Sequence, residues 1–311
     1  MSLDEQVSAE PAKVESVRAV SRQRRRASRR RFVAAFSKQR GGVAGVALLA
    51  FFVASAVLAP VLFPSDMLDV TRNVSNPANA APSSEFWLGT DENGRSILAV
   101  LAWGARISLT VGISASIITM VIGTLVGIGS GHFRGWFGAL LERLTDWFLV
   151  LPFIPLVIVL AAVLNSRGVW VMVAVLGVTS WPGTARLVRA QTLSVEGRPY
   201  LERAKVLGDS NWQQMTRHVL PNVMPLVLAN TTLTVAIVIL SETTLGFLGL
   251  GDPFTDSWGT MLDKASASGA ASTGAWWYLL PPGFCVILVV LAFTLIGRAL
   301  EVVLNPRLGE R

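Results

Sequence analysis

Few residues in this 311-residue sequence could carry out catalysis. The two histidines, His132 and His218, and the only cysteine, Cys285, lie far apart in the chain, which argues against a metal centre or a Cys/His nucleophile. None of the lysines lies in a glycine-rich loop followed by Ser or Thr, so the chain lacks the phosphate-binding loop that holds ATP in many ATPases. We therefore expect a protein that is not itself an enzyme, has no catalytic residues and binds no metal or cofactor.

Carboxylates inside long hydrophobic runs are the next candidates, because an acidic group placed in a membrane usually has a function. Glu242 comes about twenty residues after the start of the run 219–241, or about 30 Å along a helix. It could line a transport pathway, or it could be an end residue hydrogen-bonded to threonine. Thr231, Thr232 and Thr234 in the same run are further pathway candidates, with hydrogen bonding between helices as the alternative.

Asp146 opens another hydrophobic run, at a depth similar to that of Arg186 and Arg189. The sequence predicts a structural ion pair here, and a proton relay is the alternative.

The composition shows what must position these residues. Hydrophobic residues make up 52% of the chain and charged residues only 15%, and the mean hydropathy is +0.53. Each hydrophobic run is close to the roughly 20 residues that a helix needs to cross a bilayer. We predict an all-α polytopic membrane protein with six transmembrane helices, at residues 41–63, 107–131, 147–165, 168–185, 219–241 and 276–297.

The basic residues predict the orientation. If both termini are cytoplasmic, only five of the 27 lysines and arginines lie outside, namely Arg72, Arg95, Arg106, Arg167 and Lys264. Such a bias fixes the topology under the positive-inside rule. Residues 64–106 and 251–275 are then external segments, and residues 196–221 are cytoplasmic.

The N-terminal residues 1–31 are predicted to form a basic, mobile cytoplasmic tail that precedes the transmembrane domain at 32–309. A basic tail could bind nucleic acid. Beside a transmembrane helix, an anchor for lipid headgroups is favoured, and we expect no nucleic-acid partner.

The cytoplasmic segment 196–221 predicts a hairpin of two short amphipathic helices. Pro199 suits a first helical turn, Gly208 ends the first helix, and Ser210 with Gln213 forms a capping-box pattern for the second. The apolar faces consist of Tyr200, Leu201, Ala204 and Leu207 in the first helix, and Trp212, Met215 and Val219 in the second. Such a hairpin on a membrane surface can contact a partner protein.

The hairpin resembles the cytoplasmic coupling loop of ABC-importer permeases, whose pattern is Glu-Ala-Ala, three residues, Gly, nine residues, an apolar residue, one more residue and Leu-Pro. The matching positions here are Glu202, Arg203, Ala204, Gly208, His218, Val219, Leu220 and Pro221. The spacing from glycine to Leu-Pro is the same, although Arg203 replaces an alanine and His218 replaces the apolar residue. A histidine here is similar to the version found in dipeptide, oligopeptide and nickel permeases.

Other segments resemble the C-type permease of that subfamily rather than its B-type partner. They are residues 87–95 (WLGTDENGR), 104–109 (GARISL), 246–251 (GFLGLG), 257–262 (SWGTML) and 305–308 (NPRL). Ser96 stands where the subfamily usually has aspartate. The resemblance covers residues 32–309.

This resemblance implies a type I ABC-importer permease in the plasma (inner) membrane of a prokaryote. Its partners would be a homologous B-type permease, cytoplasmic ABC ATPase subunits that use ATP and Mg, an extracytoplasmic substrate-binding protein and membrane lipid. The expected cargo is a dipeptide or oligopeptide. The implied ATPase-coupling residues are Tyr200, Glu202, Arg203, Ala204, Leu207, Gly208, His218 and Pro221.

A gradient-driven secondary transporter of small solutes is the alternative function. Such proteins usually contain repeated halves around an ion site, and no such repeat is evident in this sequence.

Overall fold

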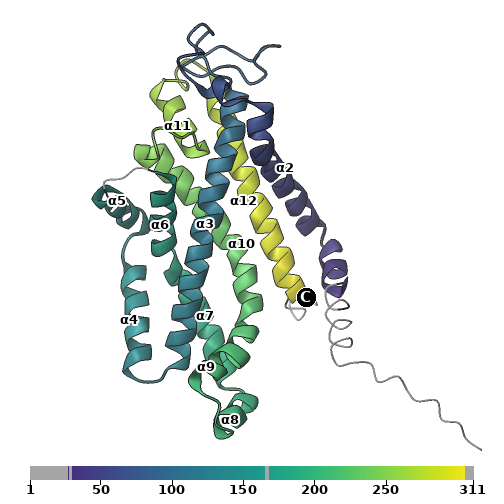
Figure 1. Cartoon of the computed structure of the whole chain (residues 1–311), viewed down its shortest axis with the longest axis vertical. Helices are drawn as coiled ribbons and strands as arrows, with labels where there is room; N and C mark the ends of the chain where they lie inside the picture. Colours follow the sequence, from purple (N-terminus) through teal and green to yellow (C-terminus); the bar gives the residue numbers. More distant parts are fainter. Residues whose placement is uncertain (1–26, 28–29, 165–167, 305–311) are drawn as a thin grey trace, which may run out of the picture.

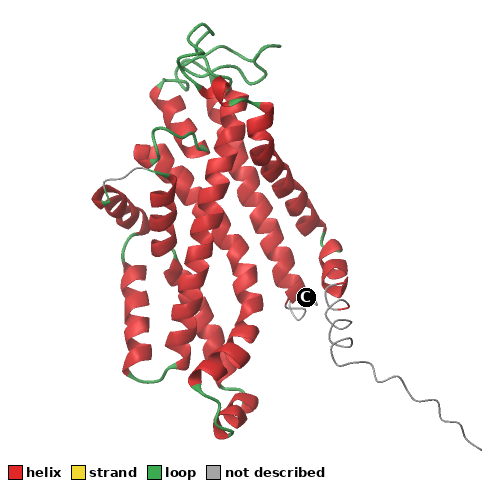
Figure 2. Cartoon of the chain, viewed as in Figure 1, coloured by secondary structure: helices red, strands yellow, loops and turns green. Residues whose placement is uncertain are grey.

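The computed structural model describes residue 27 and residues 30–164 and 168–304. Within these residues the regular elements are helices, joined by loops that carry one isolated β-bridge between Thr90 and Ser96 (Figure 2). Most of the predicted basic tail and the motif at 305–308 lie outside the described residues. The prediction of an all-α protein is confirmed.

Five helical segments are long and apolar enough to cross a membrane. They are α2 (Arg40–Leu62), α3 (Ile97–His132), α6 with α7 (Val169–Thr179 and Trp181–Glu196), the segment Asn211–Leu250 that contains α10 (Leu220–Leu245), and α12 (Trp276–Leu304). Helices α4 (Trp136–Val150) and α5 (Phe153–Val163), which meet at an angle of 95°, pass the same test only as a pair. With this bent pair counted as one crossing, the six predicted spans are all present.

The prediction of one continuous third span at 147–165 is wrong. Helix α4 begins at Trp136, and the chain turns at Leu151 and Pro152. Proline has no N–H to donate and disfavours helical backbone at the residue before it, and Leu151 is extended, with φ −69° and ψ 130°. The predicted span began too late in the chain because the charged residues near the middle of α4 were taken as its boundary.

Two helices extend beyond the limits of the predicted spans. The external segment was predicted to extend to Arg106, but α3 begins at Ile97, so residues 97–106 are helical. The fourth span was predicted to end at Ala185, but α7 continues to Glu196. Arginines marked both predicted ends, and a helix can continue past an arginine whose charged group finds a partner or reaches the membrane surface.

The ion pair predicted for Asp146 is confirmed. Its Oδ1 lies 2.8 Å from Nη2 of Arg186, and one turn away Glu142 Oε2 lies 2.8 Å from Nη2 of Arg189. These two ion pairs join α4 to α7. They explain why charged residues occur within both helices, which the hydropathy pattern alone does not.

Helix α3 packs against α7, α6, α10 and α2 and is central to the bundle (Figure 1). Its glycines allow this close packing: a Cβ at Gly123 would lie 2.7 Å from Cβ of Thr184, and one at Gly131 would lie 2.8 Å from Cβ of Thr192. A Cβ at Gly112 would lie 2.2 Å from Ile239 of α10.

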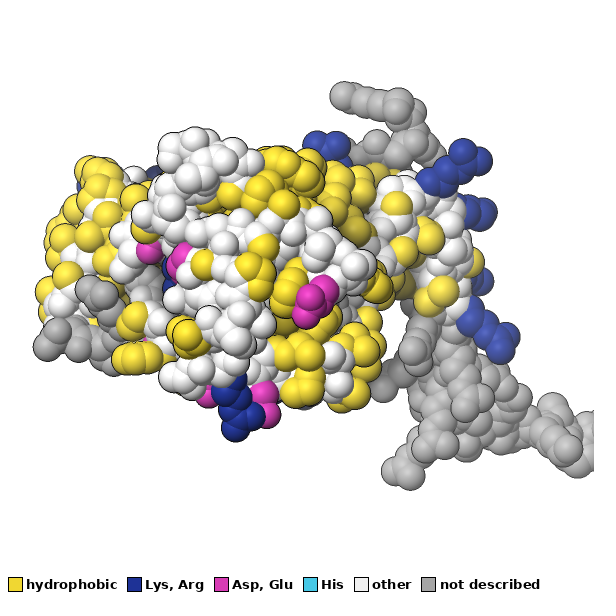
Figure 3. Space-filling view, turned by 90° about the horizontal axis from the view of Figure 1, so that it is seen from above, with side chains coloured by type: hydrophobic (Ala, Val, Ile, Leu, Met, Phe, Trp, Pro, Cys, Tyr) yellow, Lys and Arg dark blue, Asp and Glu magenta, His cyan; other side chains and the backbone are white. Residues whose placement is uncertain are grey.

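The bundle has two different ends. At one, residues 63–96 and α11 (Trp258–Ala267) cover the helices; we call this the cap end. At the other, α8 (Pro199–Val206) and α9 (Asn211–Gln213) project beyond α3 and α10 (Figure 1); we call this the hairpin end. In a view onto the cap end, hydrophobic side chains reach the outline of the molecule on several sides (Figure 3), as expected of a surface in lipid.

Replacement of Gly127 by alanine should weaken the contact between α3 and α7. The new Cβ would lie 2.6 Å from the carbonyl oxygen of Ala185 and 2.7 Å from Cβ of Val188, so a backbone must move. We expect a loss of about 2 kcal/mol in the free energy of unfolding, measured by detergent-induced denaturation. The control is Gly183→Ala in α7, where no atom lies within 4 Å of the new Cβ; equal stability of the two variants would contradict this packing.

Candidate functional site

The hairpin forms as its sequence predicts. Gly208 has a φ of +91°, a backbone conformation that glycine adopts without strain, and no atom lies within 4 Å of the position of a Cβ there. The turn thus requires glycine for its backbone angle and not for lack of space. The capping box is present: Gln213 N donates to Ser210 Oγ at 3.3 Å, and Ser210 N donates to Gln213 Oε1 at 2.9 Å.

The apolar residues of the hairpin have two different environments. Leu201 and Ala204 are buried against the protein, as predicted for the inner face of α8. Leu207, predicted on the same face, lies at the end of α8 and is 85% exposed, and its neighbour Val206 is 88% exposed. Trp212, across the turn, is 70% exposed. Val206 and Leu207 thus expose large apolar side chains at a projecting turn, as is typical of protein contact sites. Trp212 lines a separate apolar cavity with Leu125 of α3 and Phe137 of α4.

The second limb of the hairpin is held to the first by polar contacts. His218 Nε2 lies 3.1 Å from Asp209 Oδ2, and the His218 ring lies 6.0 Å from the ring of Tyr200. Asn222 Nδ2 donates to the Tyr200 hydroxyl at 3.1 Å and to the His218 carbonyl at 2.7 Å. The structure thus brings together Tyr200 and His218, two of the predicted coupling residues.

The remaining predicted residues of the hairpin lie around this contact. Glu202 and Arg203 are exposed on α8. Pro221 is exposed near the start of α10, directly after the π-helical segment that precedes it. The segment 214–219 between α9 and α10 is a π-helix, so the second limb continues into the membrane-spanning helix without a break.

A buried carboxylate that the sequence analysis missed joins the hairpin to the bundle. Glu196 is only 8% exposed, and its Oε1 lies 2.6 Å from Nδ1 of His132, at the end of α3. Its Oε2 accepts a hydrogen bond from Nζ of Lys205, in α8, at 2.6 Å. One side chain thus joins α3, α7 and α8. His132 and Glu196 are 64 positions apart, so no spacing rule could have paired them. The only signal in the sequence was the position of Glu196 as the first residue of the hairpin segment.

The predicted pathway residue Glu242 lies deep in the protein. It is 4% exposed and accepts a hydrogen bond from Ser108 Oγ at 3.0 Å; that oxygen in turn accepts from the backbone N–H of Trp258 at 3.2 Å. Glu242 therefore lies where α10, α3 and α11 meet, and its partner is a serine of another helix rather than a nearby threonine.

The three threonines lie closer to the hairpin end of α10 than Glu242 does. Thr231 and Thr232 donate to carbonyls of their own helix. Thr234 is buried; it donates to the carbonyl of Asn230 and accepts from that side chain, which also donates to Thr184 Oγ1 of α7 at 3.3 Å. A role of these residues in a pathway stays a prediction.

At the cap end, an ion-pair network joins the 87–95 motif to residues on either side of the 257–262 motif. Arg95 donates through Nε to Asp91 Oδ2 at 2.7 Å and through Nη1 to Asp256 Oδ2 at 2.8 Å. Lys264 of α11 pairs with the other oxygen of Asp256. Burial opposes ionisation of Asp256, but the charges of Arg95 and Lys264 prevail and hold the pKa of its carboxyl below the usual value. The network fastens α11 to the segment that leads into α3.

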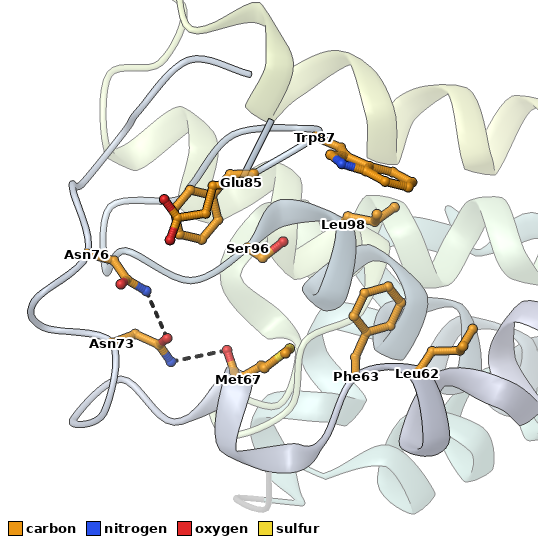
Figure 4. Close-up of a pocket in the computed structure, with 10 residues that line it drawn as sticks. Leu62, Phe63, Met67, Asn73, Asn76, Glu85, Trp87, Ser96 and Leu98 are labelled. Atoms are coloured by element: carbon orange, nitrogen blue, oxygen red, sulfur yellow. Dashed lines mark hydrogen bonds between the residues drawn. The ribbon is translucent and has the colours of Figure 1, made fainter. Parts of the chain in front are cut away.

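The same end contains a cavity of about 650 Å³ beside the last turn of α2 (Figure 4). Its walls are mainly apolar, with Phe63, Met67, Trp87 and Leu98 among them. Asn73 Nδ2 is already bonded to the carbonyl of Met67 at 3.2 Å, so its amide is used to hold the loop.

The sequence matches two families of known proteins. The family described as binding-protein-dependent transport system inner membrane component matches residues 121–310, and the N-terminal transmembrane domain of oligopeptide transport permease C matches residues 29–82.

Similar curated proteins include three bacterial permeases. The chain is 35% identical to a dipeptide transport system permease protein of Bacillus subtilis over 273 residues, which cover 87% of this chain and 83% of the relative. It is 36% identical to an oligopeptide transport system permease protein of Haemophilus influenzae over 276 residues, covering 88% and 86%. It is 34% identical to a glutathione transport system permease protein of Pectobacterium atrosepticum over 283 residues, covering 90% and 91%.

Replacement of Glu196 by alanine should destabilise the protein, because His132 and Lys205 lose a buried partner. We expect a decrease of about 3 kcal/mol in the free energy of unfolding, measured in detergent. The matched control is Glu202→Ala on the exposed face of α8, for which we expect a change within about 0.5 kcal/mol. A similar small change for both variants would mean that Glu196 does not join the helices energetically.

Replacement of Asp256 by asparagine should make the stability of the cap less dependent on pH. Because the folded-state pKa of Asp256 lies below the ordinary value of about 3.9, its stabilising effect is present above about pH 4 and is lost as the pH falls further. The difference in thermal unfolding midpoint between wild type and Asp256→Asn should thus be largest near neutral pH and shrink below about pH 4. The control is Glu85→Gln, an exposed cap residue outside the network. A difference that is constant with pH would contradict this role.

Proposed function

Because the chain belongs to the family of binding-protein-dependent transport system inner membrane components, we propose that it is the C-type permease subunit of an ATP-driven importer of dipeptides or oligopeptides. The observation that carries this proposal is the hairpin, which is exposed and apolar at its turn and firmly joined to the bundle at its base. The names of the similar permeases support a peptide cargo. They do not support the gradient-driven alternative.

We infer that the hairpin end is cytoplasmic and the cap end external. Both termini then lie on the cytoplasmic side of the plasma membrane of a prokaryote. The positive-inside bias of the sequence supports this orientation. The hairpin end carries Arg198, Arg203, Lys205 and Arg217, all in or beside the segment that would meet the cytoplasm.

The turn of the hairpin is the proposed contact with a cytoplasmic ABC ATPase subunit. Val206, Leu207 and Trp212 would enter an apolar groove of that subunit, and the exposed charges of Glu202 and Arg203 lie beside them. Interfaces of this kind rely on a few large apolar side chains at their centre. ATP and Mg would be bound and used by the ATPase, while this chain contributes no catalytic group.

Two connections would carry a displacement of the hairpin into the membrane. The second limb is continuous with α10, because the helical segment runs from Asn211 to Leu250. The first limb is joined through Lys205 and Glu196 to His132 of α3. A push on the turn would therefore move α3, α7 and α10 together as a rigid body, which is a common form of domain motion.

The remaining partners follow from the family. A homologous B-type permease would complete the translocation pathway, and an extracytoplasmic binding protein would deliver the peptide to the cap end. Selection of the cargo would then be shared among the chains rather than made by this one alone.

The double variant Val206→Glu/Leu207→Glu should lose the ATPase subunits. Two carboxylates at the centre of an apolar contact would have to be desolvated, so we expect at least about a tenfold weaker association. The measurement is quantitative mass spectrometry of proteins that co-purify with the tagged chain in mild detergent. The control is Val74→Glu, a cap residue that is 76% exposed.

In this experiment the second permease should be retained in both variants. Uptake of a radiolabelled dipeptide by cells that express the complete system should be lost in the double variant and kept in the control. Normal recovery of the ATPase with the double variant would show that the turn is not the contact.

A further inference from the structure

An arginine faces an open groove between α2 and α3 that the proposed function does not use. The groove has a volume of about 550 Å³, and among the described residues Arg106 of α3 is its only charged lining residue. The other walls are mainly apolar, with Val53 and Val57 on α2 and Leu109 and Ile113 on α3, and they include the hydroxyl residues Thr110 and Ser114. Val57 is 68% exposed, so the groove is open on the side of the molecule.

The depth of Arg106 in the membrane follows from the register of the two helices. Nε1 of Trp103 donates to the carbonyl oxygen of Phe63 at 3.0 Å, and Phe63 is the residue that ends α2. Helices α2 and α3 run in opposite directions (Figure 1), so Arg106, one turn beyond Trp103, is level with Pro60 in the last turn of α2. The outer end of a transmembrane helix lies at the headgroup level, which places the guanidinium there as well.

The groove extends from this charge toward the bilayer centre. From Arg106 to Ile113 the helix rises about 10 Å. The arrangement is therefore a cation at the headgroup level with an apolar channel beneath it, and a phospholipid has the complementary form, an anionic phosphodiester above an acyl chain.

The Arg106 guanidinium is available to such an anion. It is exposed, lies 5.8 Å from the ring of Trp103, and has no carboxylate within ion-pair distance among the described residues. Trp103 is itself held by its hydrogen bond to Phe63, so it fixes one side of the site. Within the described part of the chain no acidic residue lines the groove to attract an ammonium headgroup, which favours an anionic lipid.

We propose that the groove between α2 and α3 binds one anionic phospholipid of the leaflet at the cap end, with its phosphodiester on Arg106 and an acyl chain along Val53, Val57 and Ile113. A guanidinium binds phosphate oxygens through paired, charge-assisted hydrogen bonds. This lipid would fill the space between α2 and the helix on which the rest of the bundle packs. The proposal is independent of the ATPase contact and of the cargo.

The test is titration of the purified full chain with dioleoyl phosphatidylglycerol in a neutral detergent, with bound lipids counted by native mass spectrometry. Arg106→Gln should weaken one binding event about tenfold, since it removes a charged hydrogen-bonding group. Arg106→Lys keeps the charge but loses the paired donors of the guanidinium, so it should weaken binding less than Arg106→Gln does. Arg72→Gln is the matched control, because it removes one positive charge of the same end that is already paired with Asp66.

Two further arms identify the source of the anion. Val57→Trp keeps Arg106 but fills the groove, and should also weaken lipid binding; this variant keeps the test valid if Arg106→Gln fails to fold. Glycerol phosphate, which has the phosphate without chains, should not displace the lipid at equal concentration. Displacement by glycerol phosphate would show a simple anion site and overturn the proposal, as would equal lipid retention by Arg106→Gln and Arg72→Gln.

A last arm examines whether a protein covers the groove instead. Val57→Cys should react with a lipid-soluble maleimide both in the isolated chain and in the complex purified with its partner chains. Protection in the complex alone would mean that a partner subunit occupies the groove, and the lipid site would be rejected.

Discussion

The close approach of α3 to α7 is the contact on which the rest of the structure depends. Gly123, Gly127 and Gly131 lie at intervals of four residues and let the backbones meet where any side chain would collide. In a membrane, helices gain little from hydrophobic burial against each other, because lipid is equally apolar, so van der Waals contact at short distance must hold them together. Helix α3 thereby obtains a fixed position in the bundle, and its other contacts are set by that position.

Both ends of the molecule are attached to this one helix through polar groups. At the hairpin end, His132 binds Glu196, which also holds Lys205. At the cap end, Ser108 binds Glu242 of α10 and the backbone of α11. Between these points α3 is continuous and has no proline. A rigid helix with polar attachments near each end could transmit a displacement from one surface of such a protein to the other. The helices within the membrane would not need to rearrange to any large extent.

The sequence was sufficient for features that depend on local patterns and insufficient for those that depend on distant pairing. The hairpin, its glycine turn and its capping box are coded within a few neighbouring residues, and the number of spans follows from hydropathy. The start of α4 was missed because charged residues were taken as a boundary, whereas Asp146 and Glu142 are paired with Arg186 and Arg189 of α7. Glu196 could not be linked to His132, and Glu242 could not be linked to Ser108, because only the folded chain brings them together. The motif at 87–95 was visible, but the ion pair of its Arg95 with Asp256, just before the 257–262 motif, was not.

The exposed turn of the hairpin affects how long an unassembled copy of the protein would persist in the cell. In the orientation proposed above, a newly inserted copy would present the exposed side chains of Val206, Leu207 and Trp212 to water until the proposed partner covers them. Exposed apolar clusters are also what marks misfolded chains for chaperones and proteases, and they promote aggregation. An orphan copy of this chain would therefore be short-lived, and its abundance in the cell would follow the supply of its partner.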